Sequence, residues 1–459
     1  MTPLAIPSDP DYLSRLSQNV CEIMERFAFD EQIARMAEKE LLYDVIKALL
    51  ESTERVRFPE GIWSYGRFEG RWWRPTWLIH WTRSQKFLTA DWPHGCERDQ
   101  TRTMKIAQIA PLYEKVPPKL YGGTERIVSY LTEELVARNH DVTLFASADS
   151  VTRARLVPAS ESALRLSPTP IVDTVAHYVR LLELVFREAH QFDVLHFHID
   201  YLHFPFTKRQ SVPAVTTLHG VLSIPDLVPL YKEFREMNVV SISDAQRQPL
   251  PWIGWCGTVY HGIPEDLYQL HETPGEYLAF LGRICPEKRV DRAIEIAKRS
   301  GRKLKIAAKV DRADREYFSE YIKPLLKHPL IEFIGEIGED QKDEFVGNAL
   351  ALLFPIAWPE PFGLVLIEAM ACGTPVIAYN KGAVPEIIED GKTGFIVDNQ
   401  NDAVAAVDRL LLIDRKSCRK EFEKRFSAHR MTSDYLAIYE RIRSEAKSSI
   451  KVTTLPRAA

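Results

Sequence analysis

Two glutamates near a predicted helix start are the side chains best spaced for chemistry. Glu360 and Glu368 lie in the segment WPEPFGLVLIEAMACGTPV, with seven residues between them. Pro359 and Pro361 favour an extended chain around Glu360, and a helix is expected to begin near 362–363. Glu368 then lies roughly 7 Å further along the helix axis. That separation suits one carboxylate on a sugar and the other on the hydroxyls of a ribose.

The start of this helix is itself a candidate anion site. The first amides of a helix lack internal partners, and the helix dipole adds a partial positive charge, so a diphosphate can bind there. Gly363 permits a phosphate to approach the backbone closely. Its neighbours Phe362 and Leu364 are expected to contact the same ligand.

Two cations stand at a second strand end. In FLGRICPEK, Arg283 follows an apolar run and Lys288 opens the next expected helix. Arginine offers a bidentate fork and lysine a point charge. Together they can offset the negative charge that develops on a departing nucleotide diphosphate.

The first half of the chain offers a glycine loop and a histidine. Gly122 and Gly123 precede a helix for which Thr124 is a fair N-cap, and two glycines there allow close approach to a phosphate or sugar. A tight turn without a ligand is the alternative. His219 ends the apolar run of TTLHG, where it can hydrogen-bond sugar hydroxyls or move a proton. A structural, satisfied histidine is the alternative for this residue.

These residues follow strands in an alternating pattern. From Met104 onward, short apolar runs alternate with amphipathic helices, and the alternation restarts at Tyr277. This pattern predicts two doubly wound parallel α/β units, including a helix over 314–326 and a helical tail over about 433–448. Ligands of such sheets bind at the carboxyl ends of the strands. A cleft between the two units is therefore expected.

Bulk properties exclude several classes of protein. The 459 residues are 45% hydrophobic and 27% charged with a net charge of −4, which gives no basic field for nucleic acid. Such a length indicates two or three domains. No apolar run approaches the roughly 20 residues of a membrane span. The six scattered cysteines lack zinc-ligand spacing and favour a reducing, cytoplasmic setting.

The segment PEPFGLVLIEAMACGTPVIA resembles the signature of glycosyltransferase family 4, whose members are retaining enzymes with the GT-B fold. The resemblance implies that Glu360 contacts the donor sugar and Glu368 the ribose. It also implies that Arg283 and Lys288 bind the donor phosphates. The family commonly has glycine after this lysine, and Arg289 occupies that position here.

Three further implications follow from the resemblance. The Gly122-Gly123 loop and His219 belong to the first-domain half of the cleft, with His219 beside the reacting sugar, and the backbone around Ile337 lies near the base. A nucleotide-diphosphate sugar, UDP- or GDP-linked, is the co-substrate. The family requires no cofactor or metal to hold the diphosphate.

The domain prediction has four parts. They are an N-terminal extension, helical then irregular, over 1–103; an acceptor-side Rossmann-like domain over 104–272; a donor domain over 273–430; and a C-terminal helix and tail over 431–459. Met104 stands where the family's first strand usually begins, so it is also a candidate alternative start. The stretch RWWRPTWLIHWTR can sit at a membrane interface or bind glycans, which would give peripheral contact at the inner face of a membrane. A small accessory domain or a poorly ordered extension is the alternative for residues 1–103.

The predicted function is a hexosyltransferase that acts on an unknown hydroxyl acceptor in glycan, glycolipid or small-metabolite glycoside synthesis. A nucleotide-sugar 2-epimerase-like isomerase and a non-catalytic nucleotide-sugar-binding protein are the alternatives. The sequence does not indicate the oligomeric state.

Overall fold

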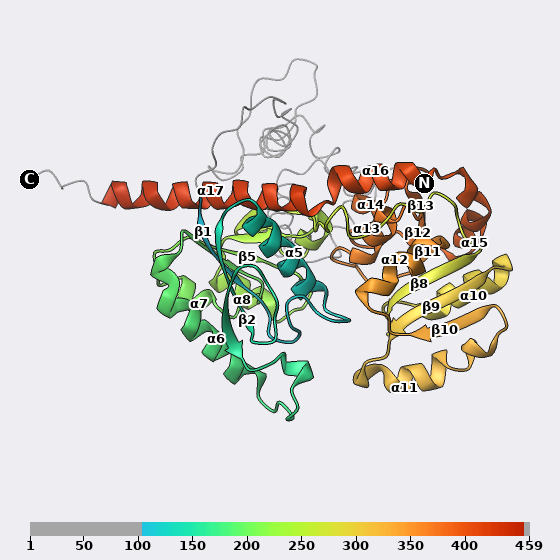
Figure 1. Cartoon of the computed structure of the whole chain (residues 1–459), viewed down its shortest axis with the longest axis horizontal. Coiled ribbons are helices and arrows are strands. Elements are labelled where there is room, and N and C mark those ends of the chain that lie inside the picture. The colour runs from blue at the N-terminus through green and yellow to red at the C-terminus, as the bar shows by residue number, and fades with distance from the viewer. Residues whose placement is uncertain (1–102, 454–459) are drawn as a thin grey trace, which may run out of the picture. The chain divides into compact units, whose positions relative to one another are not determined.

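The computed structural model describes residues 103–453, without the side chains of 447–453. These residues belong to the second of two compact units, which spans Thr101–Ala459. The predicted extension, with its Trp-rich stretch, therefore lies outside the described residues except for Thr103. Figure 1 shows two sheets, each covered by helices.

The first sheet has seven parallel strands in the order β3-β2-β1-β4-β5-β6-β7. Its strands are β1 (Lys105–Ile109), β2 (Asp141–Ser147), β3 (Arg155–Ser160), β4 (Val194–Phe197), β5 (Ala214–Thr217), β6 (Val239–Ser241) and β7 (Trp255–Thr258). Its helices are α5 (Gly123–Ala137), α6 (Thr174–Glu188), α7 (Phe204–Thr207), α8 (Leu227–Glu233) and α9 (Asp244–Arg247). The reversal of strand order between β1 and β4 is the switch point at which doubly wound sheets bind ligands.

The second sheet has six parallel strands in the order β10-β9-β8-β11-β12-β13. Its strands are β8 (Tyr277–Arg283), β9 (Lys303–Lys309), β10 (Ile331–Gly335), β11 (Ala349–Phe354), β12 (Val376–Tyr379) and β13 (Gly394–Val397). Its helices are α10 (Val290–Ser300), α11 (Arg315–Tyr317), α12 (Glu339–Gly347), α13 (Leu364–Ala371), α14 (Val384–Ile387), α15 (Gln400–Arg409) and α16 (Arg415–Arg425).

Continuous apolar runs form the central strands of both sheets. All six residues of β11, ALALLF, are buried, and so are four of the five residues of β1. Strands buried on both faces are typical of parallel sheets covered by helices. The prediction of two doubly wound Rossmann-like domains with the GT-B fold is thereby confirmed.

The last helix returns to the first sheet. α17 (Ala428–Thr453) follows α16 but packs along α5, as Figure 1 shows. Arg138 at the end of α5 donates hydrogen bonds to the His429 carbonyl at 2.6 Å and to the Ser433 hydroxyl at 2.9 Å. Tyr435 and Tyr439 are fully buried against the first sheet. The two ends of the described chain therefore share one core.

Three local predictions are wrong. Thr124 is not an N-cap, because α5 begins at Gly123 and no side chain caps it. The helix expected over 314–326 breaks into α11, a π-helical turn over Phe318–Ile322 and a 3-10 turn over Leu325–Lys327. Pro324 between these turns has no amide hydrogen to continue a helix. The tail helix is longer than expected, since α17 runs from 428 to 453.

Candidate active site

A cleft of about 850 Å³ lies between the carboxyl edges of the two sheets. Every sequence-predicted site residue lines it. From the first sheet's side these are Gly122, Gly123 and His219, and from the second Arg283, Lys288, Ile337, Glu360, Phe362, Gly363, Leu364 and Glu368. Residues up to 246 positions apart in the sequence thus meet at one place, although their individual roles stay predictions.

Glu360 and Lys288 form an ion pair in the cleft wall. The Lys288 ammonium lies 2.6 Å from Glu360 Oε2, and the Trp358 indole donates to the same oxygen at 2.7 Å. Both charged side chains are less than a quarter exposed. The ammonium also lies 5.4 Å from the centre of the Phe354 ring. Its position is therefore fixed before any ligand arrives.

The backbone of Glu360 is fixed by the loop before α14. The Ala383 amide donates to the Glu360 carbonyl at 3.0 Å. Gly382 has a φ of 55°, and a Cβ there would lie 2.3 Å from that carbonyl oxygen. Only glycine accommodates both the left-handed backbone and this approach.

Arg283 is held more loosely than Lys288. Its guanidinium lies 3.5 Å from an Asp311 oxygen and 3.7 Å from an Asp314 oxygen, and its side chain is about one-third exposed. Lys309, at the end of the neighbouring strand β9, also pairs with Asp311 at 3.0 Å. Two cations from adjacent strand ends therefore border the same part of the cleft.

The backbone conformation at Arg289 explains why glycine would suit this position. The residue has φ 53° and ψ 49°, a left-handed conformation immediately before α10. Glycine adopts this conformation without strain, whereas other residues pay roughly 1–2 kcal/mol. The Arg289 guanidinium pairs with Asp291 at 2.7 Å.

The glycine loops of the two halves approach each other. Gly363 precedes α13 with a φ of 91°, and a Cβ on Gly123 would lie 3.3 Å from Leu364 Cδ1. The N-termini of α5 and α13 thus border one cleft, where their unpaired amides favour an anion. Phe362 is nearly fully buried and packs edge-on against His261, with ring centres 4.9 Å apart.

Glu368 joins an ion network that crosses the cleft. Lys342 lies 2.8 Å from Glu368 and 3.2 Å from Glu339. Glu339 in turn contacts the Arg126 guanidinium of α5 at 2.5 Å. Burial alone would raise the pKa of Glu339, but the charges of Lys342 and Arg126 outweigh it and lower that pKa. The network joins α12 and α13, which cover the second sheet, to α5, which covers the first.

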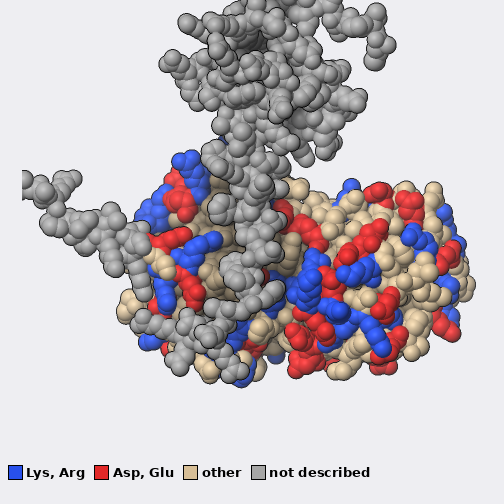
Figure 2. Space-filling view, turned by 90° about the horizontal axis from the view of Figure 1, so that it is seen from above, with Lys and Arg blue, Asp and Glu red and all other residues tan. Residues whose placement is uncertain are grey.

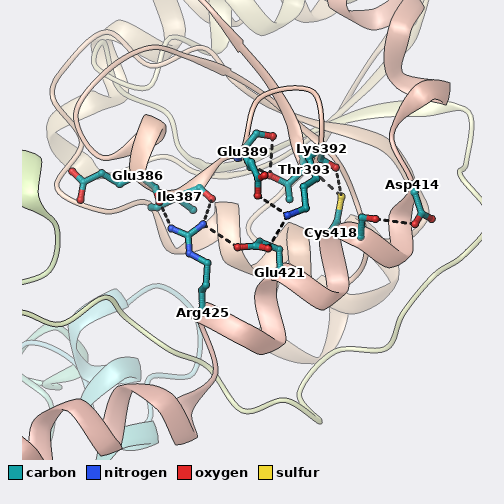
Figure 3. Close-up of polar contacts among 10 residues, drawn as sticks. Glu386, Ile387, Glu389, Lys392, Thr393, Asp414, Cys418, Glu421 and Arg425 are labelled. Atoms are coloured by element: carbon teal, nitrogen blue, oxygen red, sulfur yellow. Dashed lines mark hydrogen bonds and ion pairs between the residues drawn. The ribbon is translucent and has the colours of Figure 1, made fainter. Parts of the chain in front are cut away.

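A second contact between the halves runs through Glu386 of α14. Its carboxylate accepts hydrogen bonds of 2.7 Å from the Asp244 and Ala245 amides at the start of α9. Figure 3 shows that its backbone carbonyl instead faces Arg425, which also lies 3.4 Å from Glu421. Ser243 caps the start of α9, since its hydroxyl accepts from the Gln246 amide.

His219 is half-buried and lies among other histidines. Its Nε2 is 3.0 Å from His198 Nδ1, and its ring stacks on His261 with centres 5.2 Å apart. Burial lowers the pKa of His219 to about 3. His196, within β4, is fully buried.

Asp200 is a cleft residue that the sequence reasoning missed. It follows β4 with a φ of 51°, lines the cleft, and has no ion pair within residues 103–453. It is open to the cleft, but the surrounding walls desolvate it and raise its pKa to about 6. Its place after a strand end was a usable signal, as it was for His219. Lys309 was also missed.

Three further observations concern the described residues as a whole. Residues 103–453 contain no group of three or more side chains arranged to hold a metal ion. No helix among them is both long and apolar enough to cross a bilayer. Basic and acidic side chains alternate over the face in Figure 2.

Two family models match this chain. The model for "Glycosyl transferases group 1" matches residues 268–427, and that for "Glycosyltransferase Family 4" matches residues 121–247. Together with the fold, these matches define a glycosyltransferase of GT-B architecture. The chain belongs to the group 1 glycosyltransferases, with a family 4 first domain.

Curated relatives match most of the chain. Spore coat protein SA of Bacillus subtilis is 26% identical over 399 residues, covering 74% of this chain and all of the relative. A phosphatidyl-myo-inositol mannosyltransferase of Mycobacterium leprae is 28% identical over 357 residues, covering 69% of this chain and 89% of the relative.

Solved structures share the fold. Sucrose-phosphate synthase from Thermosynechococcus elongatus aligns with a TM-score of 0.62 at 18% identity, over 75% of this chain and all of that one. An Anabaena protein in complex with UDP and glucose aligns with a TM-score of 0.57 at 17% identity, over 74% of this chain and all of that one. At these identities the likeness shows the fold alone.

Proposed function

We propose that this chain is a retaining hexosyltransferase that moves a sugar from a nucleotide-diphosphate sugar to an acceptor hydroxyl. One observation carries the proposal: Arg283, Lys288 and the N-terminus of α13 border one cleft together with Glu360 and Glu368. Two cations and a helix N-terminus suit a diphosphate. Two carboxylates alongside them suit the hydroxyls of a sugar and a ribose.

Each half of the donor has a place in this arrangement. Lys288, Arg283 and the amides near Gly363 stabilise the charge on the leaving diphosphate. Glu360 orients the transferred sugar, and Glu368 binds the ribose next to Lys342. The backbone near Ile337 borders the base. Closure of the two halves excludes water, which would otherwise compete as the acceptor.

UDP is the nucleotide we expect first. The fold of the Anabaena protein that holds UDP and glucose is the support for this choice, and GDP is the second candidate. Arg283 and Lys288 can balance the negative charge of the diphosphate, which is consistent with donor binding without a metal. The acceptor proton passes to the departing phosphate in the retaining route that we propose.

A donor screen tests the proposal. The full chain is incubated with UDP-, GDP- and ADP-linked glucose and mannose, with and without a cell extract as the source of acceptor. We expect nucleotide release from one donor that rises when extract is added, and an α-linked product by NMR. Isomerised donor without release would indicate an epimerase, and tight binding without turnover would indicate a nucleotide-sugar-binding protein. Either result would overturn the proposal.

A further inference from the structure

A chain of buried hydrogen bonds connects α17 to the cleft. It begins at Tyr439, whose hydroxyl lies 3.1 Å from Gln108 Nε2 on β1. Gln108 Oε1 lies 2.9 Å from His198 Nε2, just after β4. His198 Nδ1 lies 3.0 Å from His219 Nε2, just after β5. Apart from His219, the members of this chain are almost fully buried, so the protein itself must satisfy their polar atoms.

The proton positions follow from one end of this chain. The Gln108 amide nitrogen can only donate, so it donates to Tyr439 and the amide oxygen must accept. The acceptor oxygen requires a proton on His198 Nε2. A neutral histidine carries one proton, so His198 Nδ1 has a lone pair and accepts from His219 Nε2. His219 Nδ1 then carries no proton.

A side branch at Tyr439 is compatible with this orientation of Gln108. Tyr439 also lies 2.6 Å from His196 Nδ1, while His196 Nε2 lies 2.7 Å from the Thr217 hydroxyl. Tyr439 has a single proton. When that proton goes to His196, the Tyr439 oxygen must accept from Gln108, as the series of hydrogen bonds from Tyr439 to His219 requires.

Both histidines stay neutral. Burial, together with the neighbouring histidines, keeps the pKa of His198 well below its usual value. Burial lowers that of His219 to about 3. No carboxylate is hydrogen-bonded to either ring within the described residues. The single-proton reasoning above therefore applies near neutral pH.

We propose that Gln108 and His198 are positioning residues that hold His219 as the Nε2–H tautomer, leaving Nδ1 as a hydrogen-bond acceptor for the cleft. Nε2 of His219 is engaged by the protein, so Nδ1 is the ring nitrogen left for a ligand. A neutral nitrogen with a lone pair accepts from a hydroxyl and repels a carboxylate. This inference rests on the proposed function. The free lone pair on Nδ1 makes the partner of His219 a hydroxyl of the sugar or of the acceptor.

Nitrogen-15 NMR of histidine-labelled full-length protein tests the tautomer directly. The two ring nitrogens of a neutral histidine give distinct signals, and His219→Asn identifies those of His219. We expect the proton of His219 on Nε2 in the wild type. A proton on Nδ1, or a mixture of tautomers, would overturn the proposal.

Two variants test the role of Gln108. Gln108→Leu removes the acceptor for His198, so we expect a mixture of His219 tautomers. His203→Gln is the matched control, because His203 is equally buried in this domain but bonds Thr207 and Thr216 instead. An unchanged His219 spectrum in Gln108→Leu would refute the positioning role.

Rates separate this inference from the function on which it rests. With the donor identified by the screen, Gln108→Leu should lower kcat/KM about tenfold, the equivalent of one hydrogen bond. Absence of sugar transfer in the wild type, with the Nε2–H tautomer present, would refute the proposed function alone. Normal transfer with the Nδ1–H tautomer would refute the tautomer proposal alone.

Discussion

Replacing Lys288 with alanine removes the cation that is held most firmly in the cleft. In the described structure its ammonium lies 2.6 Å from Glu360 and is less than a quarter exposed. In the proposed reaction the same charge stabilises the leaving diphosphate. A preorganised donor of this kind typically contributes about 2.7–4 kcal/mol to the transition state. We therefore expect Lys288→Ala to lower kcat by roughly 100- to 1000-fold.

The effect on folding should be far smaller. Without Lys288, Glu360 keeps the Trp358 indole as a hydrogen-bond donor at 2.7 Å. Loss of one hydrogen bond to a charged group costs about 1.5–3 kcal/mol, well below the stability of a typical domain of about 5–15 kcal/mol. The variant should therefore unfold cooperatively, at a somewhat lower urea concentration.

Initial rates of nucleotide release provide the assay. Lys298→Ala is the matched control, because Lys298 lies on the adjoining helix α10 and pairs with Glu295 at 3.2 Å outside the cleft. We expect this control to turn over at the wild-type rate. A Lys288→Ala enzyme with near-normal turnover would show that the diphosphate binds elsewhere and would refute the reasoning.

Four further predictions concern the surrounding structure. Glu368→Ala should raise the donor KM about tenfold with little change in kcat, because a ribose contact is made equally in ground and transition states; a purely kcat effect would contradict the assignment. Arg415→Ala should lower the free energy of unfolding by about 3–5 kcal/mol in urea titrations, since this buried guanidinium donates to three backbone carbonyls and a threonine. Arg289→Gly should be about 1 kcal/mol more stable than Arg289→Ala by the same method, because only glycine relieves the left-handed backbone. The folded state lowers the pKa of Glu339 from 4.5, so the pairing of Glu339 with Arg126 stabilises the fold above pH 4.5. This stabilisation is lost as the pH falls through the lower pKa of the folded state. Arg126→Ala should therefore weaken the dependence of the free energy of unfolding on acid pH, and an unchanged dependence would argue against this pairing.

The sequence predicts the α/β framework well because buried parallel strands are continuous apolar runs. β11 is such a run, and its signal needs no tertiary information. The edge strands β3 and β7 lack that signal, because half-exposed positions interrupt their apolar pattern. They were not predicted for that reason. The broken helix after β9 was not predicted, because Pro324 alone does not show where the helix before it ends.

The candidate site was predictable where chemistry and strand ends coincide. Lys288 comes after the end of β8 and Glu360 after the end of β11, and the structure places the two side chains in contact. The Arg126–Glu339 pair joins residues from different sheets, and neither residue type nor spacing indicates it. Asp200 carried only its position after β4, and its left-handed backbone appears only in three dimensions.

The return of α17 to the first sheet means that the two halves are not two consecutive stretches of polypeptide. A fragment that stopped near residue 272 would lack Tyr435 and Tyr439, so His196 and Thr217 would each lose a tyrosine partner. During synthesis, the histidine-bearing side of the cleft therefore cannot reach its final form until almost the entire polypeptide has been made. Trimming of the distal end would damage that side first, at a distance of more than two hundred residues along the chain.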